Sequence, residues 1–159
     1  MDRIKKILSN RLFLDINNEI TELERERIFC KHDIEHLTSV ARIMYINNLE
    51  NGLGMDKELI YASALLHDIG RAEQYKNGRE HSIAGLEISE KILSTSGFSE
   101  DEIELINSAI ESHNSNEECN NELSNLLKYA DKKSRNCFLC LASAECYWSD
   151  EKKNKTIEY

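Results

Sequence analysis

The stretch Ala64-Leu65-Leu66-His67-Asp68-Ile69-Gly70-Arg71 decides how this sequence folds and where its chemistry lies. Its histidine and aspartate follow an apolar stripe in which Ile60 and Ala64 share a helical face with His67. An ionisable side chain on a face directed at a core usually needs a partner or a metal ion. We therefore expect His67 and Asp68 to converge on one point near the end of a helix.

Working outward, further histidines and an aspartate lie on or beside apolar helical stripes. They are His32, His36, His81, His113 and Asp131. Each one alone could be a hydrogen-bonded core residue. Together, neutral imidazoles and carboxylates on several helices can point at one interior place, which is what a divalent transition metal requires. The pattern favours a metal site inside a helical bundle.

The order of these residues resembles the HD-domain metal-dependent phosphohydrolases, whose pattern is a His, a His-Asp pair and a distant Asp on successive helices. The match is to His36, His67-Asp68 and Asp131, and the resemblance covers residues 30–136. Two surrounding stretches also look like family segments: Ile34-Glu35-His36-Leu37-Thr38-Ser39-Val40-Ala41 and Tyr129-Ala130-Asp131-Lys132-Lys133-Ser134-Arg135. An ordered set of this kind is far more specific than an isolated His-Asp dipeptide.

The resemblance implies a ligand set for two metal ions. The first ion would be held by His36, His67, Asp68 and Asp131, and Asp68 would bridge to a second ion held by His81 and His113. The alternative is one metal ion, with the last two histidines contacting its ligands or the substrate. Nitrogen-rich ligation favours iron or manganese, while zinc, nickel or magnesium remain possible.

Three further side chains are candidates for catalysis beside the bridging Asp68. Arg71 follows the His-Asp pair, and Arg135 lies one helical turn beyond Asp131, so either could clamp a phosphate. The alternative for both arginines is an exposed position on the surface. His32 could donate a proton to the leaving group or contact a metal ligand.

Subfamily features bear on the substrate. The chain has no proline, which excludes the Gly-Tyr-Pro extension of cyclic dinucleotide phosphodiesterases, and residues 69–73 lack the Glu-Asp pair of guanosine tetraphosphate hydrolases. The layout is similar to that of bacterial symmetrical dinucleoside tetraphosphate hydrolases. The resemblance thus implies a phosphohydrolase that cleaves a phosphoester or phosphoanhydride of a nucleotide-like small molecule by metal-activated hydroxide. A mononuclear nucleoside monophosphatase and a non-catalytic metal or nucleotide sensor are the alternatives.

Composition limits the number of domains and the kinds of partner that this protein can have. The 159 residues are 40% apolar, so we expect a single HD domain over 1–159 with a charged tail at 149–159. The formal charge of −9 argues against a general nucleic-acid partner and leaves a small phosphorylated substrate. No signal peptide or apolar run of membrane-spanning length is apparent, so we expect a cytoplasmic protein without a membrane partner. The oligomeric state is left open.

Helical periodicity, six glycines and no proline predict an all-α fold. We expect loops at 71–79 and 114–121. The expected helices cover 1–8, a segment from Asn18 or Thr21 toward Cys30, 33–48, 56–69, 81–95, 99–113, and a last region from Leu123 that continues as apolar material over 138–148. Capping-box spacing at Thr21 and Glu24 and at Ser99 and Glu102 marks two of the starts.

The cysteines are odd in number, which argues against a disulfide framework and predicts mostly free thiols. They are Cys30, Cys119, Cys137, Cys140 and Cys146. The spacing of Cys137 and Cys140 is that of a zinc ribbon. Because no second pair exists and the stretch looks apolar and helical, we interpret this pair as core packing rather than a metal site.

Overall fold

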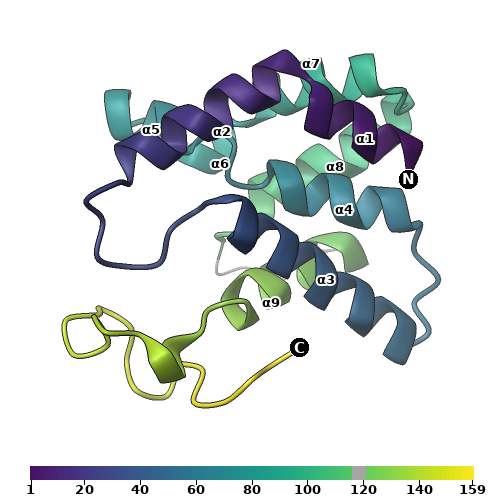
Figure 1. Cartoon of the computed structure of the whole chain (residues 1–159). Helices are drawn as coiled ribbons and strands as arrows, with labels where there is room; N and C mark the ends of the chain where they lie inside the picture. Colours follow the sequence, from purple (N-terminus) through teal and green to yellow (C-terminus); the bar gives the residue numbers. More distant parts are fainter. Residues whose placement is uncertain (116–120) are drawn as a thin grey trace.

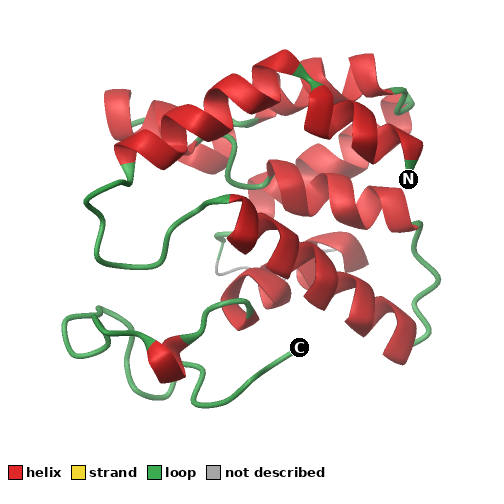
Figure 2. Cartoon of the chain, viewed as in Figure 1, coloured by secondary structure: helices red, strands yellow, loops and turns green. Residues whose placement is uncertain are grey.

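A computed structural model describes residues 1–115 and 121–159 of the chain. Across these ranges the backbone is helix and loop with no strand, which confirms the all-α expectation (Figure 2). In chain order the helices are α1 (Asp2–Ser9), α2 (Arg11–Leu23), α3 (Ile34–Glu50), α4 (Lys57–Leu66), α5 (Arg71–Asn77), α6 (His81–Ala84), α7 (Leu86–Ser96), α8 (Glu100–Ser112), α9 (Glu122–Lys133) and the 3-10 turn η1 (Cys137–Leu139).

Helices α3, α4, α8 and α9 pack around the main apolar core, while α1, α2 and α7 cover its other side (Figure 1). Side chains from all four central helices are fully buried there, among them Val40, Met44, Leu66, Ile110 and Leu127. Close packing of this kind fixes the relative positions of the helices. The histidines and aspartates on their inner faces are therefore held on a rigid frame.

Side-chain caps fix where the site-bearing helices begin. The carboxylate of Asp33 accepts a hydrogen bond from the backbone N–H of His36 at 3.0 Å, and that of Asp56 accepts from Glu58 at 2.9 Å. These bonds satisfy donors that the first turn of a helix leaves free. The predicted capping box of Ser99 and Glu102 is present at the start of α8 and is confirmed.

The second helix differs from the prediction. It starts at Arg11, where Asn10 caps it by accepting a bond from the N–H of Leu12 at 2.9 Å, and it ends at Leu23. Residues 24–33 form a loop, so the Thr21 capping box is wrong. His32 belongs to this loop and not to a turn of α3. Its place near the site is therefore set by the fold of the loop and not by helical spacing from His36.

Two predicted boundaries around the site were also wrong. Residues 71–77 form α5 rather than a loop, and Gly78 ends this helix in the left-handed region at φ 73°. The Asn77-Gly78 signal marks a helix end because only glycine adopts such a φ without strain. The expected helix at 81–95 is divided into α6 and α7 at Gly85.

The C-terminal part of the chain is the largest departure. Residues 138–148 do not continue as a helix, because their apolar side chains have nothing to pack against: Leu141 and Tyr147 are 104% and 85% exposed. The segment 149–159 is hydrogen-bonded to the end of α9, because the buried Asn154 donates to the carbonyls of Lys132 and Arg135 at 2.8 Å. It is not a free charged tail.

The cysteine interpretation changes with this segment. The four cysteines that the structure describes carry free thiols, as expected, and Cys119 lies outside the described residues. Cys137 and Cys140 are half-buried on η1 and the turn after it. Their assignment to core packing is wrong, because the helix on which it rested does not form.

Among the described helices, none combines the length and the apolar character needed to cross a membrane. The single-domain boundaries and the cytoplasmic location stay predictions.

Candidate metal centre

The six expected metal ligands meet in two groups that share Asp68. Within each group the donor atoms lie within 4.8 Å of one another. The first group is His36, His67, Asp68 and Asp131, and the second group is Asp68, His81 and His113. They come from α3, the turn after α4, α6, the end of α8, and α9, so residues up to 95 positions apart in the sequence converge. All but the half-buried Asp131 are buried.

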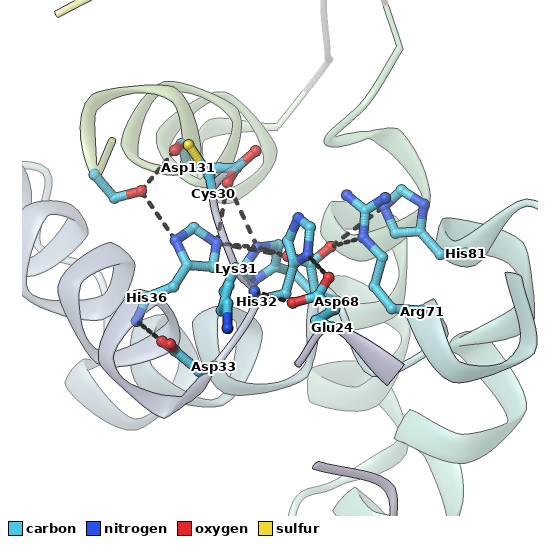
Figure 3. A network of polar contacts seen from close by, with 12 residues as sticks. Glu24, Cys30, Lys31, His32, Asp33, His36, Asp68, Arg71, His81 and Asp131 are labelled. Atoms are coloured by element: carbon cyan, nitrogen blue, oxygen red, sulfur yellow. Dashed lines mark hydrogen bonds and ion pairs between the residues drawn. The ribbon is translucent and has the colours of Figure 1, made fainter. Parts of the chain in front are cut away.

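The first group is compact. Nε2 of His67 lies 3.0 Å from Oδ2 of Asp68. Nε2 of His36 lies 3.2 Å from Oδ1 of Asp131, and Figure 3 shows these two residues beside Asp68. The two Nε2 atoms are themselves 3.4 Å apart. Nitrogen and oxygen donors therefore face one point from two helices and a turn.

Hydrogen bonds at the far side of each ring decide which nitrogen carries the proton. Nδ1 of His67 donates to the carbonyl of Ala64 at 2.8 Å. The hydroxyl of Ser134 donates to the carbonyl of Asp131 at 2.7 Å, so it accepts from Nδ1 of His36 at 3.1 Å. Both arrangements leave the Nε2 lone pairs directed into the first group, as metal-binding histidines require.

The charge balance of the first group also fits a cation. Burial lowers the pKa of His67, but Asp68 and Asp131 outweigh burial and raise it to about 10. Burial alone would raise the pKa of Asp68, yet His67 and Arg71 hold it well below its usual range. The buried carboxylates thus retain negative charge and need positive charge beside them, which a proton on His67 or a divalent metal ion supplies. Oδ2 of Asp68 has no hydrogen-bond partner among the described residues.

The second group lies on the other side of the same carboxylate. Nε2 of His81 is 3.4 Å from Oδ1 of Asp68 and 3.3 Å from Nε2 of His113. Nδ1 of His113 donates to the carbonyl of Ile110 at 2.5 Å, which again leaves Nε2 free. Burial lowers the pKa of both histidines, that of His81 to about 3, so both rings are neutral at physiological pH, as metal binding requires.

The turn after α4 packs against α6 through Gly70. A Cβ atom on Gly70 would lie 2.1 Å from the carbonyl oxygen of His81 and 2.6 Å from the backbone nitrogen of Gly85. Only glycine permits this approach. Gly70, which lies at the start of α5, therefore brings His81 beside Asp68.

The two candidate arginines are paired with ligand carboxylates. Arg135 donates to Oδ1 of Asp131 at 2.9 Å, and Arg71 donates from Nε to Oδ1 of Asp68 at 2.9 Å. Their side chains are only 10% and 19% exposed, so neither is the solvated surface arginine of the alternative interpretation. Each holds its carboxylate in place and puts a cation beside the expected phosphate position. Phosphate binding by either one stays a prediction.

His32 is held by Glu24, which sequence reasoning missed. Its Nδ1 lies 2.5 Å from Oε1 of Glu24, its backbone N–H donates to Oε2 at 2.7 Å, and the hydroxyl of Tyr75 donates to the same carboxylate. Burial raises the pKa of Glu24, but these bonds outweigh burial and lower it to about 2. Nε2 of His32 therefore faces Asp68, 4.0 Å from Oδ2. No spacing in the sequence signals this pairing.

A cavity of about 230 Å³ opens beside the first group. It contacts His32, Arg71, Asp131 and Arg135 at the metal centre. Its other walls are formed by Asn114 after α8, by Lys132 on α9, and by residues of the loop before α3 and the segment after α9. These residues are Arg27, Phe29, Cys30, Cys137, Cys140, Ser143, Cys146, Tyr147, Trp148 and Lys153. The cavity is thus rich in cationic and aromatic side chains, most of which the sequence did not place at the site.

Comparison with known proteins agrees with this geometry. The family model for the HD domain matches residues 33–136, and the chain belongs to that family. It is 43% identical to an uncharacterized protein of Clostridium beijerinckii over the full length of both chains. It is also 29% identical over 131 residues to ribonuclease Y of Mycoplasma mycoides, a match that covers 82% of this chain and 29% of that relative.

A solved structure shares the fold. The crystal structure of a predicted HD superfamily hydrolase from an uncultured Thermotogales bacterium superposes with a TM-score of 0.65, at 24% identity, over 88% of this chain and 80% of that one. Family and fold together define a metal-dependent phosphohydrolase. The chain spans less than a third of the length of ribonuclease Y.

Proposed function

We propose that this protein hydrolyses a phosphoester or phosphoanhydride of a nucleotide-like small molecule at a centre of two transition-metal ions. The observation that carries the proposal is the sharing of Asp68 between two groups of buried ligands. Two ligand groups on opposite oxygens of one carboxylate are the arrangement that a bridged metal pair requires. Iron or manganese suits the mixture of imidazole and carboxylate donors.

Bound metal ions would lower the pKa of a water molecule and neutralise phosphoryl oxygens. The protein side chains then orient the substrate. Arg135 and Arg71 lie at the boundary between the ligand carboxylates and the cavity, where a guanidinium can donate two parallel hydrogen bonds to a phosphate. His32 faces the same cavity, and burial lowers its pKa, so the ring is neutral with its Nδ1 held by Glu24. Its Nε2 is therefore placed to take a proton from the attacking water and to give it to a leaving oxygen.

The cavity supports a nucleotide-like substrate more than a bare phosphate. Arg27, Lys132 and Lys153 add positive charge beyond the metal centre, and Phe29 and Trp148 offer apolar rings to a base. Phosphate groups and a heterocycle are thus both matched by the lining. The dinuclear site and this lining favour the hydrolase over a mononuclear monophosphatase or a sensor of the same fold.

A short RNA is the second candidate substrate, because of the similarity to ribonuclease Y. The metal centre would serve an RNA phosphodiester as well as a nucleotide. The net charge of −9 opposes binding of a long polyanion. We therefore place the small molecule first and expect no general affinity for nucleic acid.

A substrate panel tests the proposal. Purified protein is assayed with manganese or ferrous iron on dinucleoside polyphosphates, nucleoside monophosphates and short oligoribonucleotides, with the Asp68→Ala protein as control. We expect turnover of a nucleotide-like compound that the control lacks. If only oligoribonucleotides are cleaved, the substrate is RNA. If compounds bind but none is hydrolysed, the protein is a non-catalytic sensor.

A further inference from the structure

Four cysteines surround the cavity beside the metal centre. Cys30 comes from the loop before α3, and Cys137, Cys140 and Cys146 come from the segment after α9. All four are free thiols. Two segments about 100 residues apart therefore contribute their thiols to one place, and the mechanism proposed above uses none of them.

The backbone of the later segment places its cysteines on successive tight turns. The N–H of Cys140 donates to the carbonyl of Cys137 at 3.2 Å, and the N–H of Ser143 donates to that of Cys140 at 3.2 Å. Cys146 continues the series with a bond to Ser143 at 3.4 Å. A Cys-x-x-Cys pair on such a turn is the usual chelating half of a four-cysteine zinc site.

This segment has almost no core of its own. Between residues 137 and 148 only Ala142 is buried, whereas Leu139 is 78% exposed and Leu141 is fully exposed. Short segments that bury so little apolar surface are usually held by a disulfide or a metal ion. A metal ion bound by the thiols would hold this segment against the rest of the domain.

Three cationic side chains lie beside the four thiols. Arg135, Lys132 and Lys153 line the same cavity, and the N–H groups of Lys153 Nζ bind the carbonyl of Ser143 at 2.8 Å within the turns. Four thiolates with one divalent ion carry a net charge of −2, which these cations balance. Burial raises the pKa of the Cys30 thiol although Arg135 opposes that shift, so the bound ion itself would displace the proton from this thiol.

We propose that Cys30, Cys137, Cys140 and Cys146 bind one zinc ion. Four soft sulfur donors select zinc in a closed tetrahedral site and not the metals of the nitrogen-rich centre. No three of the four sulfur atoms lie within 4.8 Å of one another in this structure, so zinc binding requires the turns of 137–148 to move toward Cys30. The ion ties this segment to the loop that carries His32 and thereby fixes a wall of the cavity.

Metal content in the Asp68→Ala background tests the proposal without interference from the core ions. We expect the Asp68→Ala protein to retain one zinc ion per chain, and addition of Cys137→Ser and Cys140→Ser to remove it. Cys119→Ser is the matched control and should leave zinc unchanged. Cobalt in place of zinc should give thiolate-to-metal charge-transfer absorption that the serine variants lack.

A second measurement needs no ligand variant and so holds even if the serine variants misfold. In the Cys119→Ser protein the remaining thiols are the four proposed ligands. We expect them to resist a thiol reagent until a chelator removes zinc. Equal reactivity with and without chelator, iron in place of zinc, or a Cys137–Cys140 disulfide in the isolated protein would overturn the proposal.

Discussion

Oδ1 of Asp68 lies 3.4 Å from Nε2 of His81, while Oδ2 of the same carboxylate lies 3.0 Å from Nε2 of His67 on the opposite side. One side chain thus faces two groups of imidazoles that do not otherwise share a ligand. This relationship depends on the Gly70 turn, which allows α6 to approach the end of α4. The arrangement leads to five predictions about metal content, kinetics and stability.

The second group decides how many ions the centre holds. Alanine at His81 or at His113 should lower the core metal content from two ions per chain toward one, because both rings would serve the second ion. The measurement is metal per chain after purification without chelators.

Because His113 is buried, its truncation also removes packing. Ile110→Val, on the same buried helix, is the control and should keep both ions. Circular dichroism checks that each variant is folded. Unchanged stoichiometry in both histidine variants would favour the mononuclear alternative.

Arg135 should act on the substrate through its place beside Asp131. Arg135→Ala should reduce kcat/KM about tenfold or more, which corresponds to about 1.4 kcal/mol of transition-state stabilisation. Lysine should restore only part of the loss, since it cannot donate two parallel hydrogen bonds.

The chain offers a matched control for this change. Arg11 and Asp15 form an ion pair with the same four-residue spacing at an exposed position. Arg11→Ala should leave the kinetics unchanged, because exposed pairs contribute little. Wild-type kinetics in Arg135→Ala would remove this arginine from the mechanism and leave Arg71 as the candidate clamp.

Gly70→Ala should displace α6 and weaken the second group. The added Cβ would lie 2.1 Å from the carbonyl oxygen of His81, and relieving that overlap should destabilise the fold by about 2 kcal/mol or more. Gly52→Asn is the control, because no atom lies within 4 Å of a Cβ there, so its cost is confined to the backbone strain of a φ of +61°, which is smaller for asparagine than for most residues. Urea unfolding measures both. Equal stability of the two variants would show that the close approach is unimportant.

The Glu24–His32 pair predicts a pH-dependent contribution to stability. The folded pKa of Glu24 is lowered from 4.5 to about 2, so its stabilisation is complete above about pH 4.5 and is lost as the pH falls toward 2. Glu24→Gln should therefore cost about 1–3 kcal/mol at neutral pH, with a smaller difference from wild type in acid. A difference in unfolding free energy that stays constant with pH would contradict the assignment.

Much of the site was predictable because the ligands follow helical periodicity. His36, His67 and His113 lie on apolar faces whose spacing is visible in the sequence, and the resemblance supplied the order. The N-caps at Asp33 and Asp56 depend only on hydrogen bonds to the next few residues, so caps of this kind can also be predicted from sequence. Local rules were sufficient wherever a helix alone positions the residue.

Tertiary contacts explain what the sequence did not predict. Glu24 has capping-box spacing, yet it is buried against His32 and Tyr75, and those bonds form only when the loop folds over α5. The segment 138–148 has apolar residues but no facing surface, so hydrophobicity did not produce a helix. For the same two reasons the sequence did not place Phe29 and Trp148 in the cavity lining, because the structure puts one in the loop before α3 and the other in the segment after α9.

The most direct test of the central claim is the difference in metal ions per chain between wild type and Asp68→Ala, measured by elemental analysis. The shared carboxylate contacts both ligand groups, so the account predicts that the variant loses the two core ions together and loses hydrolysis with them. Any zinc bound by the cysteines cancels in the difference. Equal metal content and undiminished turnover in a folded Asp68→Ala protein would contradict the account at its centre.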